Sequence, residues 1–301
     1  MRILMPIDGS LFSKAALAFI ASRSTLIKSQ PQVELLNVQT PVSPRVLRAA
    51  GRELVLAHQL SEADKIIKPA RAQLKRAGLQ ALAKTVVGSP GTEVGRIAAA
   101  DAADLIVMGS HGHTGFMTLL FGSVTQAVLA SCNTALLVVR SDGVPKKDSL
   151  KVGIALDGSK YGLAAVRYVV KHRALFGDAP TITLVHVVPD LLNLVVPGFF
   201  GEAPAFGFAP AQMAEMQRAA FERAVAPARK LLQAAGLPTA EAQLVGNNPG
   251  DVVAGYAAKS KLDVLVLGSK GAGGLRSSVL GSVATRIAAQ CRNALLLVQQ
   301  K

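Results

Sequence analysis

The chain has 301 residues, of which 50% are hydrophobic and 17% charged, with no tryptophan and a formal net charge of +14. No apolar run approaches the ~20 residues that a membrane-spanning helix needs, and Asp8 interrupts the first apolar stretch, so we expect neither membrane insertion nor a signal peptide. The two cysteines do not indicate a disulfide framework, because a lone cysteine before a strand is usually a small buried hydrophobe. We therefore expect a cytoplasmic protein with two aliphatic cores.

The positive charge invites a nucleic-acid interpretation. The basic residues are scattered, however, as in Arg45, Arg48 and Arg52, and no aromatic residues are interleaved with them to stack on bases. A solvated, self-repelling surface is favoured over specific binding of DNA or RNA.

The first half alternates between strands and helices. In chain order we expect a strand over residues 2–7, a helix over 13–21, a strand over 33–38, a long helix over 62–77, a strand over 82–87, a helix over 93–100, a strand over 105–108, a helix over 124–131 and a last strand over 135–139. The strands are continuously apolar, which predicts a parallel sheet covered on both faces. Right-handed crossovers then give a doubly wound α/β fold with its ligand at the carboxyl ends of the strands.

The second half repeats this order. Asp8-Gly9-Ser10 matches Asp157-Gly158-Ser159 at an offset of 149 residues, and the later motifs match at 159. The predicted division is a first domain over 1–140, a linker over 141–149 and a second domain over 150–301. The second half gains about ten residues within 191–213, a Phe-rich stretch that could be a lid, an oligomer contact or a surface loop.

A glycine pattern occurs at the end of the fourth strand of each half. Gly109-Ser110-His111-Gly112 is followed after nine residues by Gly122-Ser123, and Gly268-Ser269-Lys270-Gly271 by Gly281-Ser282. A strand, a glycine loop and a helix N-terminus form an arrangement that binds phosphate, because backbone N–H groups point at the anion. Glycine there permits close approach of the backbone and positive φ angles.

With these blocks the chain resembles the universal stress protein family, as a tandem member of the ATP-binding type. Both halves carry the complete glycine pattern and a first strand ending in Asp-Gly-Ser, and the second strands end in Leu-Leu-Asn-Val-Gln (35–39) and Leu-Val-His-Val-Val (184–188). The resemblance implies two tandem Rossmann-like domains, each a five-stranded, mainly parallel sheet flanked by helices.

The resemblance also implies ATP, with Mg²⁺, at two quasi-equivalent sites. The aspartates would lie beside the nucleoside, the valines would offer backbone contacts to adenine, and the glycine loops with the following helix would hold the phosphates. The site of the first half would comprise Pro6, Asp8, Val38, Met108, Gly109, His111, Gly112, Gly122, Ser123 and Val124. The site of the second half would comprise Ala155, Asp157, Val187, Leu267, Gly268, Gly271, Gly281, Ser282 and Val283.

Structural roles for the same residues stay open. Asp8 and Asp157 could cap the first helix of each half together with Ser10 and Ser159. The glycines could be turn residues without a ligand, and Ser123 and Ser282 would be good helix caps in either case. His111 and His113 could pair on a metal, but no carboxylate or cysteine lies nearby in sequence, so we expect no metal site and a role for His111 as a donor to phosphate. Lys270 and Arg276 could raise the phosphate affinity of the second loop or only be exposed charges.

No enzymatic signature accompanies the predicted sites. A Walker A motif, a His-Ile-Gly-His type motif and a G-x-S-x-G elbow are all absent, and nothing places a base beside a nucleophile. We expect a non-catalytic, nucleotide-dependent regulator in the stress response, acting on unknown protein partners. A slow ATPase and a nucleotide-free protein–protein scaffold are the alternatives. The last strands, 135–139 and 294–298, are expected to pair near a pseudo-two-fold axis as an internal dimer, and two chains could associate further into a homodimer.

Overall fold

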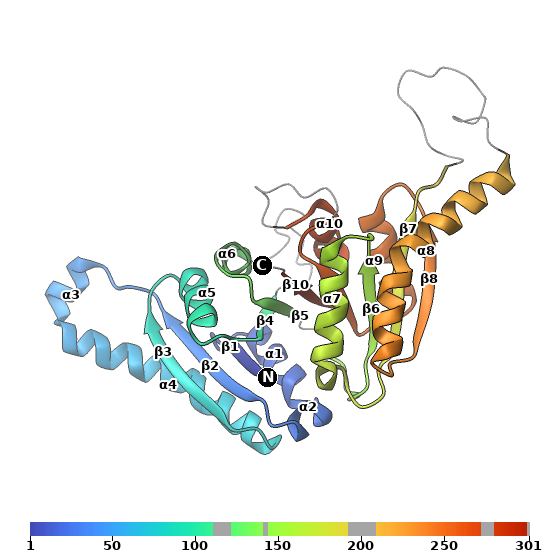
Figure 1. Cartoon of the computed structure of the whole chain (residues 1–301). Coiled ribbons are helices and arrows are strands. Elements are labelled where there is room, and N and C mark those ends of the chain that lie inside the picture. The colour runs from blue at the N-terminus through green and yellow to red at the C-terminus, as the bar shows by residue number, and fades with distance from the viewer. Residues whose placement is uncertain (111–121, 141–143, 192–208, 272–279, 300–301) are drawn as a thin grey trace, which may run out of the picture.

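The computed structural model describes residues 1–110, 122–140, 144–191, 209–271 and 280–299 (Figure 1). The first half contains β1 (Arg2–Pro6), α1 (Leu11–Ala21), α2 (Ser24–Lys28), β2 (Gln32–Gln39), α3 (Pro44–Ala50), α4 (Arg52–Arg76), β3 (Ala81–Val87), α5 (Pro90–Ala100), β4 (Leu105–Ser110), α6 (Ser123–Ser131) and β5 (Ala135–Arg140). The second half contains β6 (Lys151–Leu156), α7 (Lys160–Lys171), the short 3-10 helix η1 (Arg173–Phe176), β7 (Thr181–Val188), α8 (Pro210–Ala234), β8 (Thr239–Val245), α9 (Pro249–Lys259), β9 (Val264–Gly268), α10 (Ser282–Gln290) and β10 (Ala294–Val298).

All ten described strands form one sheet in the order β3-β2-β1-β4-β5-β10-β9-β6-β7-β8. Within each half the neighbouring strands run parallel, which confirms the doubly wound α/β fold. The two halves meet where β5 and β10 pair antiparallel, so the predicted pairing of the last strands is confirmed.

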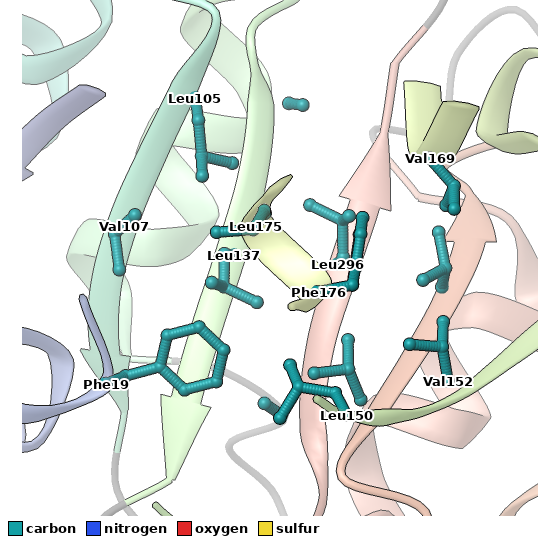
Figure 2. Packing of buried hydrophobic residues seen from close by; sticks show 14 of the residues in the cluster. Phe19, Leu105, Val107, Leu137, Leu150, Val152, Val169, Leu175, Phe176 and Leu296 are labelled. Carbon is teal, nitrogen blue, oxygen red and sulfur yellow. The ribbon is translucent and has the colours of Figure 1, made fainter. Parts of the chain in front are cut away.

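The register of that junction is symmetric. Leu137 faces Leu296, and these two residues are separated by the 159 residues that separate the equivalent glycine motifs. A pseudo-two-fold axis therefore passes between them. Figure 2 shows both leucines in one buried cluster, with Phe19 and Phe176 nearby.

Helices cover both faces of the central strands. One apolar cluster combines the sheet with α1, α4, α7 and α8, and a second combines the opposite face with α5, α6, α9 and α10. Each cluster contains residues of both halves. The two edge strands, β3 and β8, do not follow the expectation of strands buried on both faces. They are largely exposed, and Leu82 of β3 is 75% accessible.

Several elements differ from the sequence-based expectation. The helix expected over 62–77 begins at Arg52, and α2, α3 and η1 were not expected. In the Phe-rich stretch 191–213, residues 210–213 belong to α8, and 192–208 lie outside the described residues. Among the described residues no helix combines the length and the apolar character needed to cross a membrane.

The segment between the halves is held by a buried arginine. Arg23, whose side chain is fully buried, donates to the carbonyl oxygens of Pro145 at 3.0 Å and Asp148 at 2.8 Å, and also to that of Lys147. Thr25 donates its hydroxyl to the Asp148 carboxylate at 2.5 Å. The predicted linker is thereby fixed to the end of α1.

Candidate functional site

A cavity of about 600 Å³ opens at the carboxyl ends of β6, β7 and β9. This volume lies within the range of small-molecule sites, roughly 300–1,000 Å³. All nine residues predicted for the second half line it, together with Leu156, Gly162, His186, Pro249, Val253, Lys270, Leu280, Ala284 and Ile287. The structure therefore brings one complete set of predicted residues around a single space.

The wall of the cavity is mostly apolar and contains a few polar groups. Val187, Val253 and Leu267 are apolar side chains at the ends of β7 and β9 and on α9. Asp157, Lys270 and the backbone at the start of α10 are among the polar groups, and Asp157 lies close to Gly271, whose Cβ position is 3.1 Å from a carboxylate oxygen. The arrangement suits a ligand that has both a flat apolar part and an anionic part.

The aspartates of the first strands are oriented by the turn that follows them. One carboxylate oxygen of Asp157 accepts a hydrogen bond from the Ser159 N–H at 3.0 Å, and Asp8 makes the same contact with Ser10 at 3.0 Å. Burial acts to raise the pKa of Asp8, but hydrogen bonds from Ser10 and Ser13 outweigh it and hold the pKa below its usual value. Both side chains are thus held in place at the strand ends.

The caps of the first helices are the serines rather than the aspartates. Ser10 accepts from the Ser13 N–H at 3.2 Å, and Ser159 accepts from the Gly162 N–H at 3.3 Å. The intervening Gly9 and Gly158 have φ angles of 78° and 77°, which only glycine adopts without strain. The turn holds each aspartate at the strand end while the serine completes the helix.

The described motif glycines do not adopt positive φ angles, so for these residues that part of the prediction was wrong. Gly122 and Gly281 have φ angles of −58° and −65°, and Gly109, Gly268 and Gly271 also lie outside the left-handed region. A Cβ at Gly109 would lie 1.9 Å from the Phe12 carbonyl oxygen, and one at Gly268 would lie 2.8 Å from the Tyr161 backbone. These two glycines let the first helix of each half approach the end of the fourth strand.

The helices α6 and α10 begin without a side-chain cap. Their N-cap residues are Gly122 and Gly281, and Ser123 and Ser282 are the first helical residues, so the expectation that these serines cap the helices was wrong. In α10 the first intrahelical bond runs from the Thr285 N–H to the Gly281 carbonyl at 2.8 Å. The N–H groups of residues 282–284 therefore have no acceptor within the helix.

The first half places its predicted residues on the equivalent elements. Pro6 ends β1, Val38 lies near the end of β2, Met108 and Gly109 lie in β4, and Gly122, Ser123 and Val124 begin α6. Asp8 follows β1. His111 and Gly112, like His113 and Arg276, lie outside the described residues.

A polar residue in each second strand escaped the sequence-based site. His186 lines the cavity, and its Nδ1 lies 2.7 Å from the Leu156 carbonyl oxygen. Asn37, its counterpart at an offset of 149, donates to the Ile7 carbonyl at 2.9 Å. A polar residue at the same place in two apolar strands was the signal that could have identified this cross-strand contact.

No metal centre is evident in the described part of the chain. Those residues contain no group of three or more His, Cys, Asp or Glu side chains placed to hold an ion.

Comparison with known proteins identifies the class of protein. The universal stress protein family model matches residues 1–140 and again 150–299. The chain therefore belongs to the universal stress protein family and carries two copies of its unit.

Individual relatives match one copy or both. Universal stress protein MJ0577 of Methanocaldococcus jannaschii is 31% identical over 154 residues, 46% of this chain and 94% of its own length. Universal stress protein MJ0531 of the same organism is 31% identical over 150 residues, 49% of this chain and 84% of its own. The crystal structure of a universal stress protein from Archaeoglobus fulgidus covers 100% of this chain and 98% of its own at a TM-score of 0.69 and 19% identity, which supports the fold across both halves.

Proposed function

We propose that this protein is a non-catalytic, ATP-binding regulator of the stress response. The observation that carries the proposal is the cavity of about 600 Å³, whose lining combines apolar side chains at strand ends with an uncapped helix N-terminus. An adenine nucleotide has the same two parts, a flat base and an anionic phosphate chain.

The apolar side chains fit the base. Val187 and Leu267 belong to parallel strands whose carboxyl ends form one side of the cavity, and Val253 on α9 closes it. An adenine ring would bury its faces there and form hydrogen bonds with backbone groups at the strand ends. Asp157 also lines the cavity, and its carboxylate would accept hydrogen bonds from ribose hydroxyls.

The polar groups fit the phosphates. The N–H groups of residues 282–284 point out of the first turn of α10, and the helix dipole favours an anion at that position. Lys270 adds a positive charge on the same loop. Gly281 has no side chain to occupy the space between the helix and the loop, where a Cβ would lie 3.4 Å from the Gly271 nitrogen.

The first half would bind a second nucleotide on the equivalent elements. Gly122 begins α6 as Gly281 begins α10, and no described atom lies within 4 Å of the Cβ position at Gly122. Mg²⁺ would accompany the triphosphate and be held mainly by phosphate oxygens and water.

Two alternatives remain as competing proposals. A held triphosphate with Mg²⁺ and a positioned water would permit slow hydrolysis. A nucleotide-free scaffold is favoured by one observation, because packing of Gly109 against Phe12 and of Gly268 against Tyr161 explains those glycines without any ligand.

The test is calorimetric titration of the full chain with Mg·ATP. We expect binding at two sites, with one site lost in Gly122→Val and the other in Gly281→Val. The matched control is Gly255→Val, since Gly255 lies on α9 away from both loops with open space around its Cβ position. Absence of heat up to millimolar ATP, or loss of binding in the control as well, would sink the proposal. Phosphate release measured over hours distinguishes the slow ATPase.

A further inference from the structure

The helix that follows the second strand has the same length in both halves. α4 and α8 each contain 25 residues and match at an offset of 158, including an internal proline, Pro69 in α4 and Pro227 in α8. Each helix begins beyond the carboxyl edge of the sheet. In the first half α3 joins it through Gly51, whose φ of 82° allows the sharp reversal.

We define the arm as residues 44–60, which comprise α3 and the first turns of α4. Figure 1 shows the arm projecting past the sheet on the side of β3. Gln59 donates to the Thr40 carbonyl at 3.0 Å and marks the level at which α4 reaches the end of β2. The helical residues before it extend about 10 Å further, at 1.5 Å per residue.

The arm exposes large aliphatic side chains on more than one side. Val46, Leu54, Leu56 and Leu60 are between 47% and 65% accessible. Leu56 and Leu60 continue the stripe by which α4 packs on the sheet, and Leu54 lies on the opposite side of the helix. A helix that lies in a membrane interface buries one face, so Leu56 and Leu60 would form the buried face of α4.

The arm also carries a net positive charge. Residues 44–60 contain three arginines, one glutamate and no Phe, Tyr or Trp, and the rest of α4 adds five basic and two acidic side chains. Lys65 and Lys68 pair with Glu62 and Asp64, whereas no ion pair involves Arg45, Arg48 or Arg52 among the described residues. The exposed apolar groups therefore share the arm with three arginines that have no acidic partner in the described part of the chain.

We propose that the arm is a peripheral binding surface for anionic lipid headgroups. An interfacial helix combines two features. Its apolar side chains enter the boundary between headgroups and acyl chains, and basic side chains beside them attract anionic lipids. Like charges oppose pairing of two arms from two copies of the chain. Nucleic acid would leave the leucines exposed, and the arm has no aromatic side chain to stack on bases.

The second half supplies the control for this surface. At the positions of Leu54, Leu56 and Leu60, α8 carries Gln212, Ala214 and Arg218, which are exposed. The triple exchange Leu54→Gln, Leu56→Ala and Leu60→Arg therefore gives α4 the residues that the equivalent helix α8 already carries. All three are good helix formers, so the fold is expected to persist.

The experiment is flotation of the full chain with vesicles of phosphatidylcholine alone and of phosphatidylcholine mixed equally with phosphatidylglycerol. We expect binding to the mixed vesicles only, weakened by salt. The triple exchange should lower the partition coefficient at least about tenfold even though it adds a positive charge. The control Leu82→Ala replaces an exposed leucine on β3 by its counterpart in β8 and should change nothing.

Charge is tested separately. Arg45→Gln with Arg48→Gln should weaken binding by about fivefold per residue, whereas Arg218→Gln with Arg223→Gln on α8 should have little effect. Failure of the wild type to bind mixed vesicles at low salt would overturn the proposal, as would unchanged binding by a folded triple exchange. Two other outcomes would assign the arm to another partner and also overturn the proposal. They are concentration-dependent dimers, or binding of duplex DNA, that the triple exchange abolishes while no vesicle binding is seen.

Discussion

Arg23 and His172 occupy equivalent positions, 149 residues apart, at the ends of α1 and α7 beside the pseudo-two-fold axis. Arg23 holds three carbonyl groups of the segment that joins the halves. His172 lies 3.9 Å from Asp104 of the other half, and its ring centroid lies 4.5 Å from that of Tyr168. Both side chains are buried, but only one carries an obligatory charge.

The comparison shows that the two halves keep the same backbone fold although the side chains at this equivalent position differ in chemistry. The arginine fixes a segment that exists only once in the chain, whereas the histidine fills the equivalent space by packing. Differences between the halves should therefore show as unequal energetic effects of equivalent substitutions.

The largest difference is expected at this pair. Arg23→Met would leave the carbonyls of Pro145, Lys147 and Asp148 without their donor and cost about 4 kcal/mol of unfolding free energy. His172→Met would cost about 1 kcal/mol, because the ring mainly packs. Urea unfolding followed by circular dichroism measures both, and equal losses would contradict the assignment of the linker contact to Arg23.

The motif glycines give the next comparison. Gly109→Ala would drive a Cβ to 1.9 Å from a backbone oxygen and cost about 3 kcal/mol, whereas Gly268→Ala, with its nearest contacts at 2.8 Å, would cost about 1 kcal/mol. Gly255→Ala is the control and should leave stability unchanged or slightly higher. A larger loss of unfolding free energy at Gly268 than at Gly109 would contradict the closer approach of α1 to β4 than of α7 to β9.

The helix caps should be equivalent. Ser10→Ala and Ser159→Ala each remove the bond to the N–H three residues later, and loss of that cap should cost about 1 kcal/mol in each half. Thermal unfolding of the two variants side by side checks the equality. A difference much larger than a few tenths of a kcal/mol would mean that one serine has a second role.

The smallest expected effect depends on pH. Burial lowers the pKa of His172 below 6.5, against the attraction of Asp104 and in the same direction as Lys171 and the N-terminus. The unfolded chain then binds the proton more readily, so the stability contributed by neutral His172 is complete above about pH 6.5 and is lost as the pH falls below it.

His172→Gln should therefore lose less stability on acidification than the wild type does. Unfolding free energies measured at several pH values between neutral and mildly acidic would show this as a shallower slope. Identical slopes in the two proteins would contradict it.

Much of the fold was predictable because the buried strands are continuous aliphatic runs. The central strands β1, β4 and β9 lie close to where the apolar residues indicate, and the repeat placed their counterparts. The start of α4 was not predictable, because Leu54 lies on the side opposite Leu56 and Leu60, and no single stripe marks the helix there.

The candidate site was predictable in its members but not in the roles of its glycines. The spacing located Gly109, Gly268 and Gly281, and the second-half set lines one cavity. The reason for Gly109 and Gly268 is the close approach of α1 and α7, a tertiary contact that no local pattern reports. In the site region positive φ angles occur instead at Gly9 and Gly158, in the turns that follow β1 and β6.

The junction between β5 and β10 has an evolutionary consequence. In a dimer of identical chains every substitution at the axis appears on both sides at once, whereas a fused chain encodes the two sides separately. Arg140 donates to the Ala288 carbonyl across the junction at 2.8 Å, but the side-chain nitrogen of its counterpart Gln299 has no hydrogen-bond partner among the described residues. Selection can therefore improve one half of this protein without having to preserve the fit of the other.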